Sequence, residues 1–232
     1  MLKKFLLAAA AVLCCLFASV CVGLYLRSEI SSNFFIQPTF RVIIMVLACV
    51  ALYFAARLVG RAFFPERKKQ FIHGALSFSF ISYFVILVNF LFFESSFSRT
   101  HSLIFLHDGE TVSAYLDDFL NLELFGMIMR YTNGYLNGIV SFERFFMNII
   151  GNFILFMPFA FFLPILFKKQ NNFFVFSLTV ALISFAAELI QVIFMTGTGD
   201  IDDLLLNTAG ACLLFGILRT KAGKALVEFI KN

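Results

Sequence analysis

Six apolar segments, each long enough to cross a lipid bilayer, constrain this chain more than any other feature of its sequence. The hydrocarbon of a bilayer is about 30 Å thick, and an α-helix crosses it with about 20 residues. Inside the hydrocarbon a helix satisfies its own backbone hydrogen bonds, which an open sheet cannot do. The predicted spans are Phe5–Leu26, Phe40–Gly60, Phe71–Phe93, Phe145–Phe167, Phe173–Met195 and Asp203–Leu218. The expected fold is therefore an all-α, polytopic membrane bundle of about six transmembrane helices.

The composition excludes a soluble globular chain of this length. Of the 232 residues, 61% are hydrophobic and 14% are charged, whereas a soluble domain is about half apolar and about a quarter charged. The net charge of +4 comes without a basic, aromatic-rich stripe, so nucleic acid is not an expected partner and membrane lipid is. The five cysteines all lie in apolar runs without metal-ligand spacing, so neither a metal nor a cofactor is expected.

The basic residues predict how the bundle is oriented, because cytoplasmic loops of membrane proteins carry an excess of Lys and Arg. The apolar run Phe5–Leu26 follows Lys3 and Lys4, as the apolar core of a signal peptide follows basic residues. The run is longer than such a core, so we interpret it as the first span. If the N-terminus is inside, the cytoplasmic segments hold most of the 18 basic residues: Lys3, Lys4, Arg57, Arg61, Arg67, Lys68, Lys69, Lys168, Lys169, Arg219, Lys221, Lys224 and Lys231. We expect a multi-pass protein of the cell membrane with both termini in the cytoplasm.

Four regions follow from this arrangement. They are an N-terminal three-helix membrane region (1–93), an external loop (94–144), a three-helix core (145–218) and a basic cytoplasmic tail (219–232). Within the loop, Ala114–Tyr131 mixes acids with apolar residues, which predicts one or two helices lying in the outer membrane interface. A packed lid without a membrane role is the alternative. Pro158 and Pro164 predict a kink in the fourth span.

Polar residues inside the last three spans recur at helical spacing. Asn148 and Asn152 are four apart, and Glu188 and Gln191 are three apart, so each pair shares one face of its helix. Polar side chains are costly in a membrane and usually face the bundle interior or a watery cavity. We therefore expect these residues to face one another near the outer end of the bundle.

The segment TGTGDIDD, residues 196 to 203, places three acids at the start of the sixth span. Asp200 is the expected N-cap and Asp203, three residues later, the carboxylate of a capping-box variant. Asp203, Asn207 and Gly210 share one face, and Gly210 and Gly216 predict close helix approach. The candidate ligand-binding residues are Asn148, Asn152, Glu188, Gln191, Asp200, Asp202, Asp203 and Asn207. The alternative is that these residues form a hydrogen-bonded network that only joins the helices. This alternative explains Glu188 least well, because an amide could make the same helix contacts at a lower free-energy cost in the membrane.

These blocks resemble the VanZ-like family. The resemblance rests on the segment from Asn121 to Tyr131, the stretch NIIGNFILFMPF from Asn148 to Phe159, the Glu188-Leu189-Ile190-Gln191 block and the stretch GDIDDLLLNTAG from Gly199 to Gly210. It begins near residue 121 and ends near residue 218. It implies a small multispanning protein of the bacterial cell envelope, similar in some cases to factors that lower susceptibility to glycopeptide antibiotics such as teicoplanin.

Two classes of function stay open beside this resemblance. The leading hypothesis is a non-enzymatic envelope protein whose outer-facing acidic and amide pocket binds or masks an envelope lipid, a lipid-linked precursor or a glycopeptide. The alternative is a membrane enzyme acting on lipid-linked precursors, with Glu188, Asp200 and Asp203 as acid and base; no Ser/His/Asp trio, HExxH or P-loop motif supports it. A proton-coupled transporter ranks last, because the sequence shows no inverted repeat.

Overall fold

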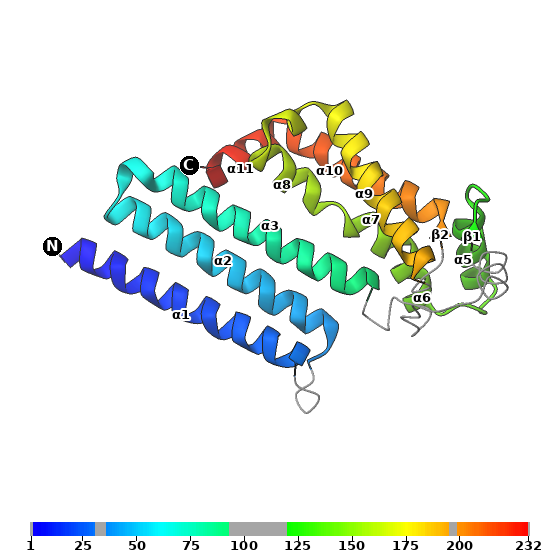
Figure 1. Cartoon of the computed structure of the whole chain (residues 1–232), viewed down its shortest axis with the longest axis horizontal. Coiled ribbons are helices and arrows are strands. Elements are labelled where there is room, and N and C mark those ends of the chain that lie inside the picture. The colour runs from blue at the N-terminus through cyan, green and yellow to red at the C-terminus, as the bar shows by residue number, and fades with distance from the viewer. Residues whose placement is uncertain (1, 31–35, 93–119, 195–198, 232) are drawn as a thin grey trace. The chain divides into compact units, whose positions relative to one another are not determined.

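The computed structural model describes residues 2–30, 36–92, 120–194 and 199–231 (Figure 1). In this part of the chain six helices are long and apolar enough to cross a membrane: Lys4–Ser28, Phe40–Ala62, Pro65–Phe92, Phe142–Leu166, Phe173–Ile193 and Ile201–Arg219. The predicted all-α, multi-pass membrane bundle is confirmed, and each predicted span overlaps one of these helices. The glycine turn at 196–198 and loop residues 94–119 lie outside the described residues.

The elements follow one another in a simple order. They are α1 (Leu2–Ile30), α2 (Pro38–Ala62), η1 (Pro65–Arg67), α3 (Lys68–Phe92), β1 (Leu120–Asn121), α5 (Gly126–Leu136), α6 (Phe142–Phe146), η2 (Met147–Gly151), α7 (Asn152–Leu155), α8 (Pro158–Leu166), η3 (Lys168–Asn171), α9 (Phe173–Ile193), β2 (Gly199–Asp200), α10 (Ile201–Arg219) and α11 (Lys221–Lys231). They form two compact units, Met1–Ile86 with Ala225–Asn232, and Leu87–Lys224.

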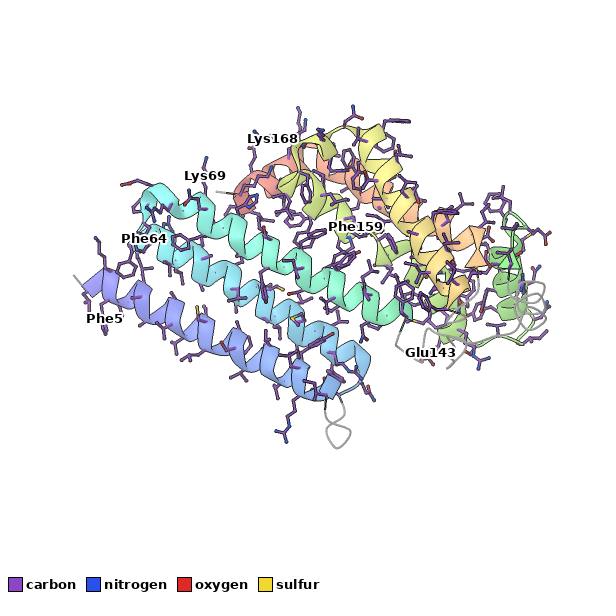
Figure 2. The ribbon with its side chains drawn as sticks, in the orientation of Figure 1. Phe5, Phe64, Lys69, Glu143, Phe159 and Lys168 are labelled. Atoms are coloured by element: carbon purple, nitrogen blue, oxygen red, sulfur yellow. The ribbon has the colours of Figure 1, made fainter. Side chains whose placement is uncertain are left out.

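In the first unit α1 packs along α2 (Figure 1). Their contact is built from small buried residues such as Ala18, Cys21, Ala48 and Ala51, which let two helix backbones come close. Phe5, Phe64 and Lys69 lie at the same end of this unit (Figure 2). That end contains the start of α1 and the turn from α2 into α3.

In the second unit α10 packs against α7, α8 and α9. Buried phenylalanines form its core, among them Phe156, Phe159 and Phe176. Phe176 stacks on Phe215 with 4.6 Å between ring centroids. A Cβ on Gly210 would stand 1.7 Å from the Phe153 carbonyl oxygen, so the predicted close approach at Gly210 is confirmed. The same prediction for Gly216 was wrong, since nothing lies within 4 Å of a Cβ there.

The fourth span is not one continuous α-helix. It consists of α6, the π-helical η2, α7 and α8. The chain leaves the helix at Phe156 and Met157 and resumes it at Pro158, in the first turn of α8. Proline has no N–H to donate and suits a first turn, so the predicted break falls immediately before it. Pro164 lies inside α8 without ending it.

The part of the predicted external loop that the structure describes forms β1, α5 and α6. Of the one or two helices expected over Ala114–Tyr131, the structure describes α5, which begins at Gly126 and continues to Leu136. Residues 120–125 are not helical, so the prediction was wrong for that stretch, and residues 114–119 lie outside the described residues. β1 pairs in parallel with β2, Leu120 against Gly199 and Asn121 against Asp200. Long-range contacts to α10, described next, account for this difference.

Candidate functional site

Asp200 is the centre of a polar cluster where α9 ends and α10 begins. Its side chain is 4% exposed and accepts a hydrogen bond from the Asp202 N–H at 2.9 Å, which confirms it as the N-cap of α10. Its other carboxylate oxygen accepts from Asn121 Nδ2, also at 2.9 Å. Asn121 reaches Asp200 because β1 pairs with β2 at this residue. The N-terminus of a helix favours such a carboxylate through its dipole.

Glu188 reaches the same point from α9. It lies within a membrane-spanning helix, is buried at 9% exposure, and accepts a hydrogen bond from the Asp200 N–H at 3.3 Å. In the predicted capping box that N–H would have bonded to Asp203. Glu188 thus provides from a neighbouring helix a bond that the local sequence assigns to α10 itself.

Asp203 joins α10 to the broken fourth span. Its Oδ1 accepts a hydrogen bond from Asn152 Nδ2 at the start of α7. Asn152 immediately follows the π-helical segment, and such segments occur frequently at functional sites. Asn121, Asn152, Glu188, Asp200 and Asp203 are called the acid–amide cluster below. It comprises two hydrogen-bonded groups beside the start of α10, one formed by Asn121, Asp200 and Glu188 and the other by Asn152 and Asp203.

One helical turn further into the bundle, a second polar contact joins α9 and α10. Asn207 Nδ2 donates to Ser184 Oγ at 3.0 Å, and both residues are buried. Ser184 precedes Glu188 by four residues and Asn207 follows Asp203 by four, so each lies on the face of its cluster residue. Within the described residues Asn207 Oδ1 is a buried acceptor without a hydrogen-bond partner. Such a group is costly unless a donor reaches it.

Asp202 plays a different part from its neighbours. It is fully buried, and its carboxylate accepts from the backbone N–H groups of Phe125 at 2.6 Å, Met127 at 2.9 Å and Ile128 at 3.1 Å. These donors belong to the N-cap and the first turn of α5, and the N-cap residue Phe125 adopts a left-handed backbone with φ of 64°. Asp202 therefore holds α5 on α10 and makes the helix begin at Gly126. Three bonds occupy most of the acceptor capacity of a carboxylate.

Asn148 and Gln191, also predicted for the site, each donate to a backbone carbonyl. Asn148 Nδ2 donates to the Arg144 carbonyl of its own span at 2.7 Å. Gln191 Nε2 donates at 2.9 Å to the carbonyl of Leu91, in the last turn of α3, where helix carbonyls lack intrahelical partners. Their shared faces with Asn152 and Glu188 did not by themselves determine their partners.

Two residues of this region were not among the predicted site residues. Ser184 has a signal in the sequence, because it lies four residues before Glu188 on the same helical face. Asn121 opens the first block of the family resemblance, but no helical spacing connects it to Asp200, since their bond spans 79 residues. Only the pairing of β1 with β2 brings it to the cluster.

The chemistry of the cluster is that of hydrogen-bond acceptors. Carboxylate and amide oxygens accept from hydroxyl, amide and ammonium groups, and carboxylates do so most strongly when the donor is charged. Among the described residues no three His, Cys, Asp or Glu side chains come together as a set that could hold a metal ion. The arrangement is suited to polar ligands that bring donors.

The comparison with known protein families covers the same sequence segments that contribute residues to this cluster. The family model described as VanZ/LLP1 matches residues 80–222, a stretch that includes the whole acid–amide cluster together with Ser184, Asp202 and Asn207. No curated protein and no solved structure matches the chain. The matched stretch is more than half of the 232 residues, and the chain is therefore a member of the VanZ/LLP1 family.

Proposed function

We propose that this membrane protein binds or masks a polar group of an envelope lipid, a lipid-linked precursor or a glycopeptide-type ligand at the acid–amide cluster, without turning it over. The observation that carries the proposal is Glu188. A carboxylate lies buried inside a spanning helix and bonds to the backbone of Asp200, itself a second buried carboxylate. The proposed ligand brings hydroxyl or ammonium donors to these oxygens.

The cost of these carboxylates supports a function beyond joining helices. Burying an ionised carboxylate costs more than burying an amide, and ionisable groups inside spans are rare and usually functional. Glutamine or asparagine would make comparable helix contacts, as Asn152 and Asn207 do here. Asn207 Oδ1 adds a buried acceptor, unpartnered within the described residues, one turn deeper.

The location in the cell and the link to antibiotics belong to the same proposal. Basic residues gather on the predicted cytoplasmic side, which would put the acid–amide cluster at the outer leaflet of the cell membrane. There it would meet envelope lipids and glycopeptides such as teicoplanin. The teicoplanin connection comes from the family resemblance, and we propose lowered susceptibility as the phenotype to measure.

Glu188→Gln and Asp203→Asn test the proposal, because each substitution removes a charge and nearly preserves shape. We expect both variants to keep membrane abundance and melting temperature close to wild type, since polar contacts within membranes average below about 1 kcal/mol. Binding of envelope lipid and any effect on teicoplanin susceptibility should be lost. Glu143→Gln is the matched control, because this acid lies exposed on α6.

Two results would contradict the proposal in different ways. Full activity of both variants at normal abundance would leave the cluster a structural network. A new lipid product formed by wild type and lost in Glu188→Gln would instead favour the enzyme alternative, in which Glu188, Asp200 and Asp203 supply the general acid and base. Product analysis of envelope lipids therefore accompanies the binding measurement.

A further inference from the structure

The C-terminal segment, expected as a basic tail, forms the helix α11 (Lys221–Lys231) of 11 residues. It begins two residues after α10, a span that ends at Arg219. About 20 residues are needed to cross a bilayer, so α11 is too short to span and starts where the membrane surface must be.

The junction between α10 and α11 is tightly built. The Gly223 N–H donates to Thr220 Oγ1 at 3.2 Å, and a Cβ on Gly223 would stand 2.4 Å from the Ile217 carbonyl oxygen. The start of α11 therefore packs against the last turn of α10. Thr220 between them is extended, with ψ of 165°, so α11 does not continue α10 as one helix.

Three different faces run along α11. Gly223, Val227 and Ile230 are its least exposed residues, at helical spacing. A second face is apolar and exposed, with Leu226 at 52% and Phe229 at 62% exposure beside two alanines. At its edge toward α2, the Arg57 guanidinium lies over the Phe229 ring, 4.5 Å from the ring centroid. The third face is charged and consists of Lys221, Lys224, Glu228 and Lys231, again at intervals of three and four.

This division is that of a helix lying in a membrane interface. One face packs on protein, as shown by Tyr53 of α2, whose hydroxyl donates to the Ile230 carbonyl at 3.1 Å. The exposed apolar face would enter the acyl region, and the lysines would meet headgroups. Three lysines against one glutamate give the charged face a net positive charge, which complements anionic lipid.

We propose that α11 is an in-plane interfacial helix that binds anionic phospholipid through Lys221, Lys224 and Lys231, with Leu226 inserted among the acyl chains. This lipid site is separate from the acid–amide cluster. It concerns the leaflet at which α10 ends, and it stands whether or not the proposed ligand binding is correct.

The absence of tryptophan from the chain permits a direct test of how deep each face lies. Leu226→Trp and Glu228→Trp each introduce a single reporter, on the apolar and on the charged face. In full-length protein reconstituted in phosphatidylglycerol-containing vesicles, we expect blue-shifted emission from the first, quenched by lipids brominated on their acyl chains. The second should be quenched by aqueous acrylamide. Equal acrylamide quenching of the two variants would overturn the proposal. A Leu226→Trp signal that neither acrylamide nor brominated lipid quenches would also overturn it, because protein would then cover the apolar face.

Lipid preference is tested with the triple variant Lys221→Gln, Lys224→Gln, Lys231→Gln. Wild type should gain thermal stability from phosphatidylglycerol over phosphatidylcholine, and the triple variant should lose most of this gain. The matched control replaces the exposed Lys4, Lys69 and Lys169 by Gln, and the corresponding triple Lys→Arg variant of α11 should behave as wild type. A retained gain in the α11 Gln variant, or an equal loss in the control, would contradict specific binding by α11.

Discussion

At the scale of single residues, Gly210 shows how one missing side chain sets the packing of the second unit. A Cβ there would overlap the Phe153 carbonyl, a backbone atom that cannot rotate away. The contact brings α10 against α7, and α7 carries Asn152, which bonds to Asp203. The acid–amide cluster therefore depends on the packing at Gly210, although Gly210 contributes no polar side chain to the cluster.

Gly210→Ala should destabilise the protein, because the added methyl group forces α10 away from Phe153. Overpacking of this kind costs about 1–3 kcal/mol, and we expect a lower melting temperature together with weaker ligand binding. The comparison is Gly216→Ala in the same helix, where nothing lies within 4 Å of the new Cβ. That variant should be neutral or stabilised, by up to about 1 kcal/mol from helix propensity. Equal behaviour of the two variants would show that close approach at Gly210 is not required.

At the scale of elements, α5 illustrates why part of the site could not be predicted from local sequence. The mixture of acids and apolar residues over Ala114–Tyr131 indicated a helix, yet the described residues before Gly126 are held in other conformations. The partners of Asn121 and Phe125 are Asp200 and Asp202, which lie 79 and 77 residues further along the chain. Helical periodicity reports neighbours three and four residues apart and carries no information about such pairs.

Asp202→Asn should loosen α5 without unfolding the spans. Asparagine keeps one acceptor oxygen but places an NH₂ donor against backbone N–H groups, so at least one of the three bonds is lost. The loss of a capping side chain and of its charge at a helix N-terminus costs about 1–2 kcal/mol. Amide hydrogen exchange at Phe125, Met127 and Ile128 should become faster. Glu123→Gln removes a neighbouring exposed charge and should leave these amides protected; similar acceleration in both variants would refute the anchoring role.

At the scale of the whole molecule, the bilayer explains how much was predictable. The six spans followed from apolar length alone, because hydrocarbon demands about 20 residues of continuous helix. The N-cap at Asp200 followed from local capping chemistry. The bonds of Glu188 to Asp200 and of Asn152 to Asp203 required three-dimensional packing. Gln191 shows the limit of prediction from helical spacing. The spacing placed it on the same face as Glu188 but did not reveal that it bonds to the Leu91 carbonyl.

The orientation of the whole bundle is the remaining prediction, and both termini are expected in the cytoplasm. Within the second unit Lys168 and Glu143 lie at opposite ends (Figure 2). Lys169, Arg219 and Lys221 adjoin the Lys168 end, because Arg219 donates to the Asn171 carbonyl at 3.2 Å. Positive charge resists translocation, so this end should stay inside.

Cysteine labelling measures the orientation directly. The described cysteines are free, so all five in the chain are first replaced by serine or alanine. Lys221→Cys and Glu143→Cys then place one exposed thiol at each end. A membrane-impermeant maleimide should label the second variant in intact cells and the first only after permeabilisation. The reverse pattern would put the acid–amide cluster on the cytoplasmic side, where an extracellular glycopeptide could not reach it. That result would exclude glycopeptides as ligands of the cluster. Lipid binding by α11 would then have to be measured with lipids of the outer leaflet.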